Sequence, residues 1–249
     1  MNKLKKIVSI REWSHKSEPL NIFERRLKDM MNLQVSTIPS NIPESSKNEA
    51  KKQYLVMLVT CYETYLKEIF KIIIDENLVA VTELMKLKRL REVKFTIEEI
   101  EFIRSKNIKL SELVSEYINF QNFREMMNSF SVIDLDKKIE KKINQKDDIM
   151  PLPDPKLLKK TIDGAEIVNQ FFKQFALHKK SLNKSQLYKQ INLLLTLRHK
   201  IIHNNIDIAI RQEDIYTMTA AIYEFIVLVD GILQDIRQNK KSAPRVIFF

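Results

Sequence analysis

Glycine is nearly absent from this chain of 249 residues, which contains only Gly164 and Gly231. A β-rich protein of this length needs many tight turns, and the favoured turns require glycine where φ is positive. The seven prolines lie outside the periodic segments, where they end helices. The sequence therefore predicts an all-α fold, with 44% hydrophobic residues to fill one substantial core or two small ones.

The composition also limits the functional classes. Cys61 is the single cysteine, so neither a disulfide framework nor a thiolate metal cluster is expected. The basic N-terminal stretch lacks the long apolar segment of a secretory signal, and the longest uncharged apolar run, 54–62, is too short to span a bilayer. We therefore expect a cytoplasmic protein that does not enter a membrane. The net charge of +10 favours a polyanionic partner, although well-solvated, lysine-rich helices also explain it.

Polar, proline-bearing stretches divide the chain. Residues 1–45 are interpreted as an N-terminal extension, 46–240 as a helical bundle with a helical insertion at about 79–160, and 241–249 as a basic and apolar tail. Two sequences typical of capping boxes, at 46–49 and 96–99, are expected to open helices. Periodicity predicts helices at about 22–33, 47–77, 96–105, 110–127, 134–143, 165–178, 184–203 and 211–237.

The segment LTLRHKIIHNN, 195–205, contains charged and titratable residues, although its apolar residues predict a buried helix. At about 100° per residue, one arc of this helix is apolar. The arc consists of Leu187, Ile191, Leu194, Leu195, Ile201 and Ile202. Arg198 falls in the middle of the arc, whereas His199 and His203 lie together on the polar face. A core-facing arginine is costly unless a carboxylate meets it, so the cluster needs an explanation.

Two carboxylates are candidate partners for Arg198. Glu63 points into the apolar stripe of the 47–77 helix, and Asp230 interrupts the apolar face of the last helix. We expect Arg198 to pair with Glu63 in preference to Asp230. Taken alone, such a pair is most simply a structural ion pair that fixes helix register.

The histidine pair is open to two interpretations from the residues alone. The simpler one is two solvated side chains on a polar face. The other is a zinc site, because histidines four positions apart lie on one side of a helix. The remaining histidines, His15 and His178, supply no evident third ligand nearby. The metal site is therefore the weaker interpretation, and no metal or cofactor is predicted.

The Arg198–His203 spacing resembles the Arg-x4–6-His motif of HEPN domains, an all-helical superfamily that includes RNA-cleaving toxins and antiviral effectors. The polar His199 directly after the arginine and Asn204 directly after the second histidine agree with the motif. Histidine stands here where asparagine or aspartate is commoner in the family.

Two further segments agree with this superfamily in their order. Residues 54–70 are similar to the first bundle helix, whose inward glutamate corresponds to Glu63, and 211–233 are similar to the closing helix. The resemblance covers about 54–75 and 184–236. Among the subfamilies, the chain is most similar to the RiboL-PSP-HEPN type.

The resemblance implies a metal-independent endoribonuclease that works as a homodimer on RNA. His203 of each copy would act as base or acid, Arg198 would stabilise the phosphorane, and His199 would bind phosphate or orient its neighbour. Glu63 and Asn204 would support these residues. The expected products are a 2′,3′-cyclic phosphate and a 5′-hydroxyl. Such a nuclease would be a toxin or defence effector, with an antitoxin or ATPase as a regulatory partner.

Two alternatives remain open at this point. One is a non-catalytic HEPN-like helical module that binds RNA, a nucleotide or a partner protein, because a fold does not guarantee an activity. The other is a zinc-dependent helical bundle that uses His199 and His203.

Overall fold

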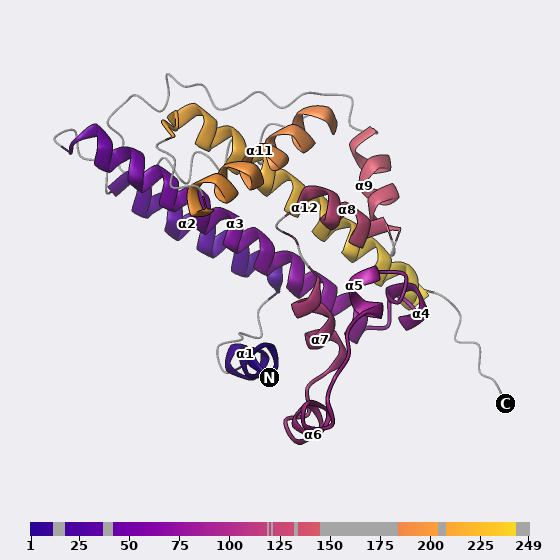
Figure 1. Cartoon of the computed structure of the whole chain (residues 1–249). Coiled ribbons are helices and arrows are strands. Elements are labelled where there is room, and N and C mark those ends of the chain that lie inside the picture. Colours follow the sequence, from indigo (N-terminus) through magenta and orange to yellow (C-terminus); the bar gives the residue numbers. More distant parts are fainter. Residues whose placement is uncertain are drawn as a thin grey trace.

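The computed structural model describes residues 1–11, 18–36, 42–118, 120, 122–131, 134–144, 184–203 and 208–242. Every regular element in these ranges is a helix, so the all-α prediction is confirmed (Figure 1). The helices are α1 (Asn2–Arg11), α2 (Pro19–Ser36), α3 (Glu44–Asp75), α4 (Val81–Leu84), α5 (Lys88–Arg91), α6 (Ile97–Ser105), α7 (Leu110–Tyr117), α8 (Phe123–Ser131), α9 (Leu135–Asn144), α11 (Lys184–His203) and α12 (Gln212–Ser242). The helix expected at 165–178 and most of the tail lie outside the described residues.

Two long helices, α3 and α12, run side by side in the same direction (Figure 1). Three contacts along their length mark this parallel pairing: Tyr54 Oη with Thr219 Oγ1 at 3.0 Å, Tyr65 Oη with the carbonyl of Ile226 at 3.1 Å, and Arg237 with Glu76. Residues later in α3 contact residues later in α12, so the two helices pack in parallel along their length. The shorter α11 packs against both long helices, and α2 packs along α3.

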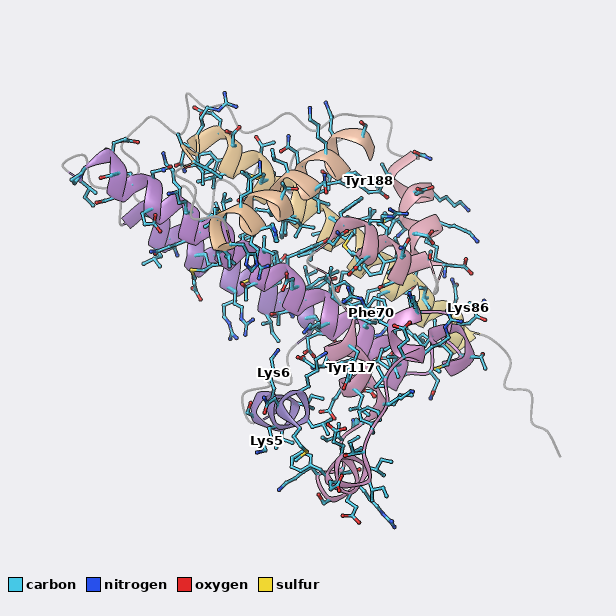
Figure 2. The ribbon with its side chains drawn as sticks, viewed as in Figure 1. Lys5, Lys6, Phe70, Lys86, Tyr117 and Tyr188 are labelled. Carbon is cyan, nitrogen blue, oxygen red and sulfur yellow. The ribbon has the colours of Figure 1, made fainter. Side chains whose placement is uncertain are left out.

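The interior is filled by aromatic rings from distant parts of the chain. Phe70 of α3 (labelled in Figure 2) lies 5.3 Å from the ring of Phe120 and 5.8 Å from that of Phe130, measured between centroids. The ring of Phe130 in turn stacks on Phe225 of α12 at 6.2 Å. Each fully buried ring contributes about 1.5–3 kcal/mol to folding. This cluster therefore joins the region expected as an insertion, 79–160, to the long helices.

The two helices that precede α3 differ in how they join the core. Helix α2, inside the expected extension 1–45, contributes Phe23, Leu27, Met30 and Met31 to the main core. Helix α1 instead packs on α6 and α7 through a small separate cluster, in which Leu4, Ile7 and Ile108 are the buried members. The bundle core thus begins before residue 46, and α1 is held by few buried groups.

Several helix boundaries differ from the sequence expectation. The capping box at 96–99 is confirmed, since Glu99 N donates to Thr96 Oγ1 at 3.2 Å and Thr96 N to Glu99 Oε2 at 3.1 Å. The box expected at 46–49 is wrong, because α3 already begins at Glu44, directly after Pro43. The single helix expected at 110–127 is also wrong: extended backbone at Ile118 separates α7 from α8. The sequence did not predict the short helices α1, α4 and α5.

Helix α12 is long and apolar enough to cross a membrane by length and composition alone. Its most apolar stretch, within Gln212–Asn239, has a mean hydropathy of 1.5, and 72% of that stretch is buried inside the bundle. A buried core helix and a membrane-spanning helix have the same composition, because each must be apolar on every side. The apolarity of α12 is thus explained by its contacts with α2, α3, α9 and α11.

Candidate functional site

Helix α11 carries the sequence motif at its C-terminal end. Its apolar arc is buried through Leu187, Ile191, Leu194 and Leu195. Ile202, expected on the same arc, is instead 45% exposed. The apolar face of α11 therefore leaves the core in the last turn of the helix, where the polar cluster lies.

The region just after the motif is fastened to the start of α3 by Asn48. Its side-chain amide donates to the carbonyl oxygen of Ile208 at 2.9 Å and accepts from the backbone N–H of Ile210 at 2.9 Å. An asparagine can serve both groups at once because its side chain carries a donor and an acceptor. This contact fixes where the chain between α11 and α12 returns to the bundle. An asparagine inside a helix is the single sequence feature that hints at this contact.

Arg198 lies where the buried arc meets the solvent. The side chain is half-buried, and its Nε is buried without a hydrogen-bond partner among the described residues. A buried donor left unsatisfied costs about 1–3 kcal/mol, and more when the group is charged. The unsatisfied donor makes the partial burial of Arg198 costly.

The two candidate carboxylate partners of Arg198 lie in different surroundings. Asp230 is occupied elsewhere: it accepts a hydrogen bond from Tyr65 Oη at 3.4 Å, and burial raises the pKa of this carboxyl. Glu63 is half-buried and lines a groove on α3 together with residues of α7 and α1. The pairing of Arg198 with a core carboxylate stays a prediction.

His199 and His203 are both exposed and lie one helical turn apart on α11. Their ring centroids are 4.6 Å apart, with 47° between the ring planes. The structure thus brings Arg198, His199 and His203 together on one short stretch of helix. Asn204, the remaining residue of the motif, lies outside the described residues.

Tyr188 is a further titratable residue of α11. Burial raises its pKa to about 12, with a smaller contribution from the charge of Glu140. A phenol with such a pKa stays protonated near neutral pH and cannot act as a general base. The two imidazoles remain the residues of α11 suited to proton transfer.

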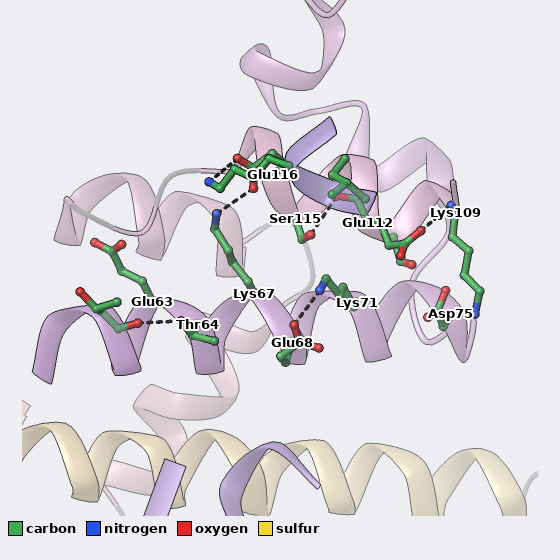
Figure 3. A pocket seen from close by; sticks show the side chains of 14 residues that line it. Glu63, Thr64, Lys67, Glu68, Lys71, Asp75, Lys109, Glu112, Ser115 and Glu116 are labelled. Carbon is green, nitrogen blue, oxygen red and sulfur yellow. Dashed lines mark hydrogen bonds and ion pairs between the residues drawn. The ribbon is translucent and has the colours of Figure 1, made fainter. Parts of the chain in front are cut away.

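A second polar region is a groove of about 690 Å³ between α1, α3 and α7 (Figure 3). Figure 3 shows Glu63 and Lys67 on the same side of α3, facing this groove. Ser111, at the start of α7, lines it with a side chain that is 1% exposed and a hydroxyl without a hydrogen-bond partner among the described residues. Lys67 and Lys71 of α3 also line this groove. Helices α1 and α7 partly cover this polar side of α3.

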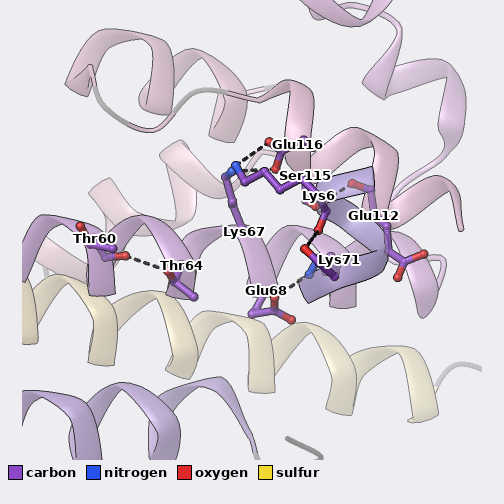
Figure 4. Close-up of polar contacts among 10 residues, drawn as sticks. Lys6, Thr60, Thr64, Lys67, Glu68, Lys71, Glu112, Ser115 and Glu116 are labelled. Atoms are coloured by element: carbon purple, nitrogen blue, oxygen red, sulfur yellow. Dashed lines mark hydrogen bonds and ion pairs between the residues drawn. The ribbon is translucent and has the colours of Figure 1, made fainter. Parts of the chain in front are cut away.

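The cations of the groove are paired with carboxylates (Figure 4). Glu116 accepts from Lys6 Nζ at 2.8 Å and from Lys67 Nζ at 3.2 Å, and Lys71 Nζ donates to Glu68 at 2.6 Å. Burial raises the pKa of Glu116, but the two lysines outweigh burial and hold that pKa below its ordinary value. Among the described residues that line the groove, none is a histidine or a cysteine. Acid–base catalysis is therefore better placed at the end of α11 than here.

Three or more His, Cys, Asp or Glu side chains do not converge in a metal-binding arrangement anywhere among the residues that the structure describes. No protein family model matches the chain, and no curated protein or solved structure matches it.

Proposed function

We propose that this protein is a HEPN-type endoribonuclease that cleaves RNA without a metal ion. The observation that carries the proposal is a half-buried Arg198, unpaired among the described residues, on the same helix end as two exposed imidazoles. These are the groups that RNA cleavage by the 2′-hydroxyl requires: a base, an acid and a fixed cation. The net charge of +10 supports a polyanionic substrate.

The proposed reaction is an in-line displacement at phosphorus. An imidazole of His203 accepts the 2′-hydroxyl proton, and the 2′-oxygen forms a bond to phosphorus. The bond from phosphorus to the 5′-oxygen breaks, and an imidazolium donates a proton to that leaving oxygen. The guanidinium of Arg198 stabilises the additional negative charge on the phosphorane. The products are a 2′,3′-cyclic phosphate and a 5′-hydroxyl.

The spacing of the histidines favours two copies of the chain around one phosphate. The attacking and leaving oxygens lie on opposite sides of phosphorus, and each needs a hydrogen bond of about 2.6–3.2 Å to its catalyst. His199 and His203 stand side by side, with centroids only 4.6 Å apart, so one chain offers imidazoles to one side. A second copy would supply the opposite His203, and the exposed Ile202 beside it would become buried in that contact.

The test is cleavage of purified RNA by the full chain in the presence and absence of EDTA, alongside three variants. We expect EDTA-resistant cleavage that is lost in His203→Ala and Arg198→Ala. The control is Lys138→Ala, an exposed cation on α9, which is expected to cleave like the wild type. Cleavage that EDTA abolishes, or that His203→Ala retains, would contradict the proposal.

The alternative is a non-catalytic HEPN-like module that binds RNA, a nucleotide or a partner protein. It is supported instead if the full chain binds RNA but leaves it intact. A toxin or defence effector is the biological role we propose for an active enzyme, with an antitoxin or ATPase partner as its restraint. The part of the chain expected as an insertion, 79–160, exposes α6 on the outside of the bundle, where such a partner has access (Figure 1).

A further inference from the structure

The geometry of His199 and His203 is suited to a ligand other than RNA. Zinc binds imidazole nitrogens at about 2.0–2.1 Å, so two ligands of a tetrahedral ion are about 3.3 Å apart. Two rings with centroids 4.6 Å apart reach this separation by rotating about their side-chain bonds, without movement of the helix. The pair is preformed because α11 fixes both residues one turn apart.

The surroundings of the pair leave its nitrogens available. Both side chains are exposed, and neither forms an ion pair with a carboxylate in the described part of the chain. They also lie at the C-terminal end of α11, where the aligned peptide dipoles favour a cation. Lys200 opposes a cation there, but its side chain is exposed and free to turn into solvent. The Nε of Arg198 is buried.

We propose that His199 and His203 form a two-histidine site for a borderline divalent cation such as Zn²⁺, and that the bound ion inhibits the nuclease. Imidazole selects zinc, copper and nickel, whereas Mg²⁺ prefers oxygen ligands and binds imidazole poorly. With two protein ligands, water completes the coordination. The inhibitory half rests on the proposed function: a nitrogen lone pair that coordinates metal cannot accept a proton from a 2′-hydroxyl. The bound metal thus inhibits the reaction here, whereas in a zinc enzyme it promotes the reaction.

Binding is tested by calorimetric titration of the metal-stripped full chain with ZnCl₂ in a non-coordinating buffer, with MgCl₂ in parallel. We expect one Zn²⁺ site per chain and no measurable Mg²⁺ binding. His199→Ala and His203→Ala should each weaken zinc by about tenfold or more, since even changes outside the ligand shell weaken metal sites about 10–100-fold. Lys200→Ala is the matched control and should bind zinc at least as tightly as the wild type. An unchanged zinc affinity in the double histidine variant would overturn the site.

Inhibition is tested separately with the wild type and a labelled RNA. We expect cleavage to fall as the zinc site fills and to return when EDTA is added. Unchanged cleavage at saturating zinc would overturn the inhibitory role. Zinc binding that depends on both histidines, in a chain that never cleaves RNA, would instead remove the nuclease proposal and leave the metal site standing.

Discussion

Replacing Arg198 by methionine is expected to separate stability from function. Methionine keeps a flexible, unbranched side chain that reaches as far as the arginine Nε, but it removes the charge and the buried Nε donor. The wild-type Nε has no hydrogen-bond partner among the described residues, and the side chain is only half-buried. If Arg198 is retained for catalysis, the variant loses activity without losing stability.

The magnitude follows from the unsatisfied donor. A buried polar group without a partner costs about 1–3 kcal/mol. Because Arg198 is half-exposed, solvent recovers part of this, and we expect Arg198→Met to raise the free energy of unfolding by about 1 kcal/mol. For a chain of this length, that corresponds to an increase in Tm of about 2–4 °C.

The assay combines urea unfolding, followed by circular dichroism, with the RNA cleavage assay. We expect higher stability and no cleavage from Arg198→Met. A loss of more than about 1 kcal/mol would refute the reasoning, because it would show that the guanidinium has a structural partner in the folded protein.

Three further perturbations test other parts of the account. Asn48→Ala should lower stability by about 1–2 kcal/mol in urea unfolding, because two part-buried hydrogen bonds are lost, whereas the exposed Gln53→Ala should change little. Burial raises the pKa of Asp230 above its ordinary value of 3.8, so the free energy of unfolding falls as pH rises from 3.8 through the pKa of the folded protein. Asp230→Asn should therefore be more stable than the wild type at pH 7, with no gain below pH 3.8. The pKa of Glu116 is lowered, so its contribution to stability is present at neutral pH and is lost as pH falls through the pKa of the folded protein. At pH 7, Glu116→Gln should lower the free energy of unfolding by about 1 kcal/mol and accelerate amide exchange in α1.

The periodicity of the sequence was sufficient to predict the long helices. Residues 47–77 and 211–237 have apolar stripes that continue for many turns, and α3 and α12 coincide with nearly all of these two ranges. The shortage of glycine likewise excluded a turn-rich β fold. The short helices α4 and α5, of four residues each, have too few turns to produce a period.

The candidate site was predictable only in its local part. Arg198, His199 and His203 lie within six residues, so one helix brings them together whatever the rest of the fold does. The partner of Arg198 depended on the rotation of α3 relative to α11, which a helical wheel does not contain. Glu63 was therefore assigned to Arg198, whereas the structure places it along the groove with Lys67. Contacts between distant segments, such as Asn48 with Ile210, leave no pattern in one sequence.

The most direct measurement is the chemistry of the RNA ends that the EDTA-treated chain produces. A target RNA is cleaved with and without a single 2′-deoxy substitution at the mapped cleavage position. We expect a 2′,3′-cyclic phosphate and a 5′-hydroxyl from the unmodified RNA, and no cut at the substituted position. Cleavage that persists at the 2′-deoxy position, or that leaves a 5′-phosphate, would contradict attack by the 2′-hydroxyl and with it the role assigned to Arg198 and His203.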